Sequence, residues 1–146
     1  MKNLIAFAFL FACVIAYTQD ENLPQIVETA FKNKYPTSKL DSWRVDNDLY
    51  YLDFYIKTNS YTSVFDKKGG WVETSEIISD FDIPVILQDY ITDTYPDGRI
   101  SYCEKVETKD SSCFFRVSLY NNEEFFVIES NNKGTNIKII KHEAEQ

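Results

Sequence analysis

The chain has little histidine and little glycine, and these two shortages exclude most familiar catalytic sites. His142 is the single histidine among 146 residues, and it lies near the C-terminus, where an imidazole cannot be held in a catalytic triad. Of the four glycines, Gly69 and Gly70 belong to a predicted turn, which excludes a glycine-rich phosphate loop. The acidic turn at residues 46–48 lacks the glycine and the distal glutamate of a calcium loop. We therefore expect no enzymatic activity, no cofactor and no metal site.

Basic residues are also scarce. Lysine and arginine total 15 against 23 aspartates and glutamates, so the net charge of -8 would repel a nucleic-acid backbone. Apolar residues, in contrast, make up 44% of the chain, which is enough for a packed core. The aromatic share of 16% favours β-strands, because aromatic side chains suit half-buried sheet surfaces. The length fits one domain or a fold built by internal duplication.

Residues 1–16, MKNLIAFAFLFACVIA, are typical of a secretory signal peptide. One lysine precedes an apolar run that ends at the small residue Ala16 and is too short for a stable membrane anchor. Cleavage there would leave residues 17–22 as an N-terminal extension and would place the protein in the periplasm or outside the cell. The alternative is a lipoprotein, because the residues around Cys13 resemble a lipobox; membrane attachment would then depend on lipidation of Cys13.

Two segments of the chain repeat the same pattern 60 positions apart. LPQIVETAFKNKYP at 23–36 aligns with IPVILQDYITDTYP at 83–96, and each carries apolar residues at helical spacing between two prolines. A proline near the first helical turn costs no hydrogen bond, whereas the second proline forces the chain out of the helix at the tyrosine before it. Each segment is therefore predicted to be an amphipathic helix.

Each predicted helix is followed by residues that alternate between apolar and polar, as β-strands do. Each stretch is predicted to form two pairs of strands, each pair joined by a turn; the turns lie at 46–48 and 67–70 in the first half and at 109–110 and 131–134 in the second. We predict an α+β fold, a tandem repeat of one helix followed by a four-stranded antiparallel meander. The repeats span 23–74 and 83–140, with a linker at 75–82 and a flexible tail at 141–146.

Several motifs in these segments point to one family. They are the helix-Tyr-Pro phrases, Trp43 after the first phrase, the hairpins WRVDNDLYYLDF and CEKVETKDSSCFFRV, and the turn VFDKKGGWVET. Together they resemble the PepSY-like, beta-lactamase-inhibitor-protein-like periplasmic domains of secreted Bacteroidetes proteins, whose turn has the form Phe-Asp-x-x-Gly-x-Trp. The second half departs from that turn, because Glu129 stands where the first half has Asp66 and no tryptophan follows Gly134. The resemblance implies a beta-lactamase-inhibitor-like fold, with helices on one face and an open concave sheet on the other. It also implies an exported binding or inhibitory module with no established enzymatic activity.

Cys103 and Cys113 flank one predicted hairpin. A two-residue turn at Lys109-Asp110 would place them on opposite faces of the sheet and forbid a bridge, whereas a longer loop centred on Thr108, or a bulge, would set them face to face. Exported proteins usually oxidise an even pair of cysteines, and the family resemblance implies hairpin bridges, so we predict a Cys103–Cys113 disulfide, with two reduced thiols as the alternative.

The strand pattern also separates a core face from an outer face. In the strand at 49–57, the residues at even positions 50 to 56 are predicted to be core, which leaves Tyr51 and Tyr55 outside. In the second half the residues at 115, 117 and 119 are predicted core, which leaves Phe114, Arg116 and Tyr120 outside. Aromatic and arginine side chains dominate binding hot spots, so these five outer residues are the candidate binding site. The alternative is that the two halves, or two copies of the chain, bury these aromatics against each other.

These observations favour an exported, non-enzymatic binding module for a protein or peptide in the periplasm or outside the cell, with an inhibitor as one form of it. We expect a monomer or a weak homodimer. The alternatives are a structural or envelope-assembly lipoprotein and, with less support from the residues, an enzyme. Inhibition of a beta-lactamase is not predicted, because a shared fold does not transmit a target.

Overall fold

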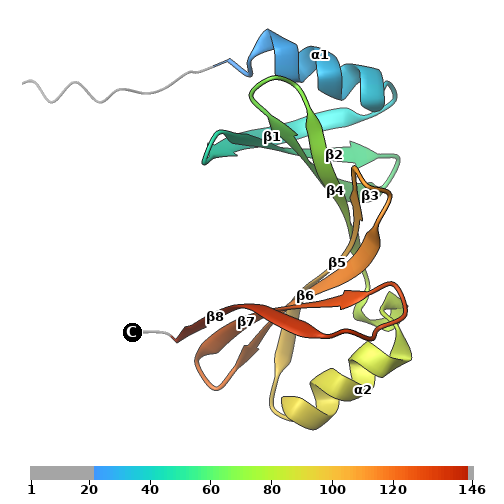
Figure 1. The fold of residues 1–146 in the computed structure, drawn as a ribbon, viewed down its shortest axis with the longest axis vertical. Coiled ribbons are helices and arrows are strands. Elements are labelled where there is room, and N and C mark those ends of the chain that lie inside the picture. Colours follow the sequence, from blue (N-terminus) through green and yellow to red (C-terminus); the bar gives the residue numbers. More distant parts are fainter. Residues whose placement is uncertain (1–21, 145–146) are drawn as a thin grey trace, which may run out of the picture.

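The computed structural model describes residues 22–144 of the chain. The elements follow one another as α1 (Gln25–Lys34), β1 (Lys39–Asp46), β2 (Leu49–Ile56), β3 (Asn59–Asp66), β4 (Trp71–Ile78), a short 3-10 helix η1 (Asp80–Asp82), α2 (Val85–Thr94), β5 (Arg99–Thr108), β6 (Cys113–Asn121), β7 (Glu124–Asn131) and β8 (Lys138–Ala144). The eight strands form one open antiparallel sheet in the order β1 to β8 (Figure 1). The prediction of two helices with an antiparallel open sheet is therefore confirmed. The predicted signal peptide, Cys13 and most of the predicted N-terminal extension lie outside the described residues.

The two helices begin and end at equivalent residues with nearly the same backbone angles. Pro24 precedes α1 with φ -54° and ψ 132°, and Pro84 precedes α2 with φ -55° and ψ 138°. At the other end, the backbone N–H of Tyr35 donates to the carbonyl of Phe31, and that of Tyr95 donates to the carbonyl of Ile91. The Tyr-Pro phrase therefore ends each helix, because the residue before a proline is disfavoured in the helical region.

Each helix packs on its own hydrophobic core. Val27 and Phe31 of α1 pack with Leu52, Phe54 and Phe65 of β2 and β3. The core of α2 contains Leu87 and Ile91 together with residues of β5, β6 and β7, namely Cys103, Phe115, Val117, Leu119, Phe126 and Ile128. The strand positions predicted as core in β2 and β6 are thus the ones that pack against the helices. In Figure 1 the sheet bends into an arc, with α1 beside one end and α2 beside the other.

Two tight hairpins fix the register of the strands on either side of them. Asn47 and Asp48 between β1 and β2 have φ of 48° and 64°, and Asn122 and Glu123 between β6 and β7 have φ of 49° and 66°. Two consecutive residues with positive φ form the two-residue turn that matches the twist of antiparallel strands. A one-residue slip would turn every side chain of such a hairpin to the other face, so these turns help to determine which residues face outward.

Two predicted boundaries are wrong. Strand β4 runs to Ile78 and pairs with β5 up to the pair Ile78–Cys103, so residues 75–78 are strand rather than linker. Strand β8 runs to Ala144, and residues 141–144 pair with β7 instead of forming a flexible tail. Residues 75–78 continue an inner strand, whose backbone pairs with β5. Residues 141–144 lie in the edge strand β8, which tolerates charged residues because its backbone hydrogen bonds do not depend on apolar side chains.

The predicted Cys103–Cys113 disulfide is also wrong, because both thiols are free. The loop between β5 and β6 covers residues 109–112, and the register pairs Cys113 with Glu107 and Cys103 with Val117. Cys113 therefore lies opposite a position four residues along β5 from Cys103, which corresponds to about 13 Å at the usual strand rise. A disulfide requires Cα atoms within about 7 Å of each other. Burial raises the pKa of the Cys103 thiol to about 11, which keeps it protonated and unreactive.

Candidate functional site: the outer face of the sheet

The strand residues that alternate with the core positions form the side of the sheet that the two cores do not use; we call it the outer face. All five residues predicted as binding residues occupy such alternate positions: Tyr51 and Tyr55 on β2, and Phe114, Arg116 and Tyr120 on β6. The structure brings three of them near the middle of the sheet, where Tyr51 and Arg116 line one groove and Phe114 lies under Arg116. Tyr120 instead contacts Phe125, with 5.0 Å between ring centroids and the ring planes tilted by 49°, and lines a separate hollow.

Arg116 is the centre of a charged cluster that joins four strands. Its guanidinium lies 3.0 Å from Glu129 Oε1 on β7, 3.2 Å from Glu73 Oε1 on β4 and 3.8 Å from Glu104 Oε2 on β5. Both Nε and Nη2 of Arg116 contact Glu129 Oε1, each at 3.0 Å. Glu73 lies on β4, which contacts both cores through Trp71 and Ile78, and the other members lie on strands packed on α2, so the cluster lies where the two halves meet.

This charged cluster is largely shielded from water. The side chains of Arg116, Glu73, Glu104 and Glu129 are 22%, 23%, 11% and 25% exposed. Burial raises the pKa of Glu104, and repulsion from Glu73 and Glu129 adds to this effect, while Ser75 and Arg116 oppose it. Burial alone would lower the pKa of Arg116, but the surrounding glutamates outweigh it and raise the pKa. One guanidinium thus holds three carboxylates in a site of reduced polarity.

A second charged cluster lies on β1, β2 and β3. Asp53 accepts hydrogen bonds from Ser42 Oγ at 3.1 Å, from Arg44 Nη1 at 3.2 Å and from Thr62 Oγ1 at 2.7 Å. Arg44 also stacks over Tyr51, with its guanidinium carbon 4.7 Å from the ring centroid. Arg116 repeats this arrangement over Phe114 at 5.3 Å. The outer face therefore holds two arginines that each contact an aromatic ring and a carboxylate.

The two clusters enclose a groove of about 250 Å³ at the middle of the outer face. Arg44, Tyr51, Glu73, Tyr102, Glu104 and Arg116 line it, together with small residues of β3, β4 and β6. Two of these small residues, Val64 and Ser75, are buried, at 4% and 5% exposed. The groove is thus a polar-walled depression with rings at its sides rather than an apolar cavity.

Sequence reasoning missed six members of this site: Arg44, Asp53, Glu73, Tyr102, Glu104 and Glu129. The alternation of residues in a strand could have placed Glu104 beside Arg116 only with the four-residue loop at 109–112, because the predicted two-residue turn would set Cys103 opposite Arg116. Glu73 could not be found in this way, since it lies 43 positions before Arg116 and meets it only through the pairing of β4 with β5.

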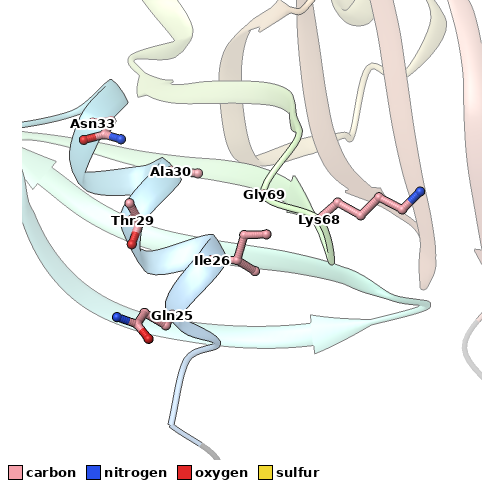
Figure 2. Close-up of a pocket in the computed structure, with 7 residues that line it drawn as sticks. All are labelled: Gln25, Ile26, Thr29, Ala30, Asn33, Lys68 and Gly69. Carbon is pink, nitrogen blue, oxygen red and sulfur yellow. The ribbon is translucent and has the colours of Figure 1, made fainter.

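A larger hollow lies elsewhere, between α1 and the turn after β3 (Figure 2). It has a volume of about 470 Å³ and is lined by Gln25, Ile26, Thr29, Ala30, Asn33, Lys68 and Gly69. Figure 2 shows the side chain of Lys68 extending away from the helix, so the one charged group does not converge with the amides. This hollow lacks the combined charges and rings of the outer-face groove, and we assign it no ligand.

The described residues contain neither a metal-binding cluster nor a membrane-spanning helix. Among residues 22–144, no three His, Cys, Asp or Glu side chains are arranged to hold a metal ion; the three glutamates of the central cluster surround a guanidinium instead. Neither helix of the described part of the chain has the length and apolar character needed to cross a bilayer.

Comparison with known proteins gives one family and a group of related structures. The model of the family described as "Putative beta-lactamase-inhibitor-like, PepSY-like" matches residues 13–59 and 48–132, and this description names no catalytic activity. No curated protein matches the chain.

Three crystal structures of Bacteroides proteins share the fold. A DUF2874 family protein from Bacteroides uniformis is 21% identical, with a TM-score of 0.69 over 83% of this chain and 88% of that one. A protein from Bacteroides eggerthii described as "putative periplasmic" is 17% identical, with a TM-score of 0.70 over 84% and 88%. A BLIP-like protein from Bacteroides fragilis is 16% identical, with a TM-score of 0.64 over 86% and 94%. At these identities the likeness establishes a beta-lactamase-inhibitor-like fold.

Proposed function

Because this chain belongs to the PepSY-like, beta-lactamase-inhibitor-like family, we propose that it is an exported, non-enzymatic binding module that holds a protein or peptide partner on the outer face of its sheet. In this proposal the two helix-plus-four-strand segments form a tandem repeat and present one continuous concave surface. The description of the Bacteroides eggerthii relative as "putative periplasmic" supports the exported location. An inhibitor role, as in the name of the family, is one form of this function.

The observation that carries the proposal is the combination of anchored rings and charges on a sheet face that neither core uses. Tyr51 and Phe114 are held in place by Arg44 and Arg116, which are themselves fixed by carboxylates. Aromatic and arginine side chains with restricted motion lose little conformational entropy on binding, and they are the residue types that dominate interface energetics. The outer face therefore has preorganised anchors.

The size of this face also suits a protein partner. Eight strands lie side by side in the sheet. At a spacing of about 4.8 Å they give a face about 34 Å wide, and strands of about eight residues are about 26 Å long. The product is about 900 Å², close to the roughly 800 Å² that each partner contributes to a standard protein interface.

The proposal is tested by affinity capture from an envelope extract of the organism that produces the chain. The wild type is compared with a Tyr51→Ala/Tyr55→Ala/Phe114→Ala variant and with a control variant, Ile26→Ala/Phe81→Ala/Val85→Ala. The control residues are also large, apolar and exposed, at 53%, 85% and 67%, but they lie in the helical segments. We expect the outer-face variant to lose the captured partner and the control to retain it. Equal recovery with both variants, each folded by circular dichroism, would contradict the assigned surface.

The exported location has its own measurement. Mass spectrometry of the mature protein should find an N-terminus that begins after Ala16, as expected for the signal peptide in residues 1–16. A lipid-modified Cys13 at the N-terminus would instead show the lipoprotein, and a chain that retains residues 1–16 would contradict export by this route.

A further inference from the structure

The charges around the central groove do not balance. Four carboxylates, those of Asp53, Glu73, Glu104 and Glu129, surround the two guanidinium groups of Arg44 and Arg116. With all six groups ionised they carry two negative charges in excess, and Lys138, which lies opposite Glu129 on β8, offsets one of these. Such a charge excess in a partly shielded depression attracts a cation more strongly than the same charges on an open surface would.

Glu104 is the most buried of these carboxylates and lies farthest from a guanidinium, with a hydrogen bond from Ser75 as its other contact. Its side chain is 11% exposed, against 23% for Glu73 and 25% for Glu129. Arg116 nevertheless lies 3.8 Å from Glu104, farther than its 3.2 Å and 3.0 Å contacts with the other two. A carboxylate in such a site is stabilised by a further cationic donor, because the cost of its burial is then offset by a charge-assisted hydrogen bond, which the 3.8 Å contact with Arg116 is too long to supply.

Two arginines of the outer face bind in the same way, each against an aromatic ring and a carboxylate. Arg44 lies over Tyr51 while it donates to Asp53, and Arg116 lies over Phe114 while it donates to Glu129. Tyr102, which is 36% exposed, lines the groove beside Glu104 and offers a third ring next to a third carboxylate. A planar guanidinium can stack on a ring and donate to a carboxylate at once, which the point charge of a lysine does less well.

We propose that the central groove receives an arginine side chain of the partner between Tyr102 and Glu104, so that the partner presents a basic segment to the outer face. This inference rests on the proposed function and adds the charge and residue type of the ligand. Repulsion from Glu73 and Glu129, which helps to raise the pKa of Glu104, would be relieved by the incoming charge. A second copy of this chain does not fit as the occupant, because a two-fold contact would place the same excess negative charge against itself.

The charge preference is tested directly with two small probes, N-acetyl-arginine amide and N-acetyl-citrulline amide. Citrulline has nearly the shape of arginine but carries a neutral urea group. In NMR titrations of the uniformly labelled protein, we expect the arginine probe to shift the backbone amides of β4, β5 and β6 around the groove. We expect at least about tenfold weaker binding of the citrulline probe, the change that corresponds to one lost charge-assisted hydrogen bond. Equal shifts from both probes, or shifts confined to the helices, would overturn the proposal.

Substitutions of two glutamates on opposite sides of β5 test which side of the sheet binds the arginine probe. Glu104→Gln removes the carboxylate on the outer face, whereas Glu107→Gln removes an exposed carboxylate from the other side of β5. We expect Glu104→Gln to weaken binding of the arginine probe by about tenfold and Glu107→Gln to leave it unchanged. Glu73→Gln, whose carboxylate lies at the same groove, should also weaken binding and keeps the test valid if Glu104→Gln does not fold. Unchanged binding in folded Glu104→Gln or Glu73→Gln protein would overturn the proposal.

Release of the captured partner by the two probes distinguishes failure of the arginine assignment from failure of the proposed function. Arginine probe should release the partner from the immobilised wild type at a concentration at which citrulline probe does not. Equal release by the two probes would overturn the arginine assignment and leave the outer face as the binding surface. Capture that is unaffected by the Tyr51→Ala/Tyr55→Ala/Phe114→Ala substitutions would instead refute the proposed function itself. Self-association of the wild type that the arginine probe disrupts would also overturn the inference, because the occupant would then be a second copy.

Discussion

Replacement of Arg116 by methionine should be among the more destabilising single changes on the outer face. The substitution keeps most of the apolar stem that lies over Phe114 but removes the one guanidinium that contacts Glu73, Glu104 and Glu129. Three carboxylates at 75% or more burial then face one another without a cation. Removal of one partner from a fully buried pair costs about 3 to 5 kcal/mol. Because a fifth to a quarter of most of these side chains still contacts water, we expect the lower end, about 3 kcal/mol at pH 7.

The matched control is Arg44→Met, which removes the other arginine of the same face. Arg44 and Asp53 are 58% and 33% exposed, and Asp53 keeps its hydrogen bonds from Ser42 and Thr62. An exposed ion pair contributes about 0.2 to 1 kcal/mol, so this variant should lose less than about 1 kcal/mol. The difference between the two arginines tests whether burial and the number of carboxylates determine the cost.

The assay is urea unfolding of the wild type and both variants in 0.15 M salt, about the physiological ionic strength, at pH 7 and at about pH 4. Fluorescence of Trp43 and Trp71 reports on the half of the sheet packed on α1, and far-UV circular dichroism reports on the whole chain. The loss of unfolding free energy in Arg116→Met, relative to the wild type, should be smaller at the lower pH, because the glutamates bind protons there and no longer repel one another. A deficit below about 1 kcal/mol at pH 7, or one that does not change with pH, would refute the role assigned to the cluster.

Three further results are expected. Glu104→Gln should make the free energy of unfolding less dependent on pH. The pKa of Glu104 in the folded protein is raised from its ordinary value of 4.5. The stability that this carboxyl contributes is therefore fully present below pH 4.5 and is lost as the pH rises through the folded pKa. Urea unfolding at several pH values would contradict this if the unfolding free energy of the variant changed with pH as steeply as that of the wild type. Alkylation with mass mapping should label Cys113 in the folded protein and Cys103 only after unfolding, because Cys103 is 2% exposed; a Cys103–Cys113 peptide under non-reducing conditions would contradict the structure. Gly134→Ala should lower stability by about 2 kcal/mol, because Gly134 has φ +78° and an added Cβ would lie 2.7 Å from Cβ of Pro84. A thermal midpoint equal to that of the wild type would rule this out.

The helices and the alternation of two strands could be predicted from the sequence because they depend on local signals. The two prolines that bracket each helix and the even-numbered apolar residues of 49–57 act within a few residues of one another, and they correctly identified α1, α2 and the core side of β2. The aromatic hot-spot argument likewise selected Tyr51 and Arg116, which line the groove; their role as binding residues stays a prediction.

The remaining features depend on how distant segments align. Glu73 reaches Arg116 only because β4 pairs with β5 and β5 with β6 in one particular register, and no local pattern determines the register between the halves. The disulfide prediction failed for a local reason, the length of one hairpin loop, since the loop at 109–112 sets Cys113 opposite Glu107 instead of Cys103. The predicted tail failed because β7 provides a strand edge on which even a charged segment can pair.

The order of the strands in the sheet, β1 to β8, is the order in which they are synthesised. Every strand therefore pairs with the strand that precedes it in the chain, and no segment must wait for a distant one to form its backbone hydrogen bonds. Folds made of such neighbouring contacts tend to form quickly, and arrays of this kind can grow from one stable unit to the next. The first core, on α1, can be complete before the residues of β5 to β8 exist. The pairing of β4 with β5 would then offer the newly made half an edge on which to assemble.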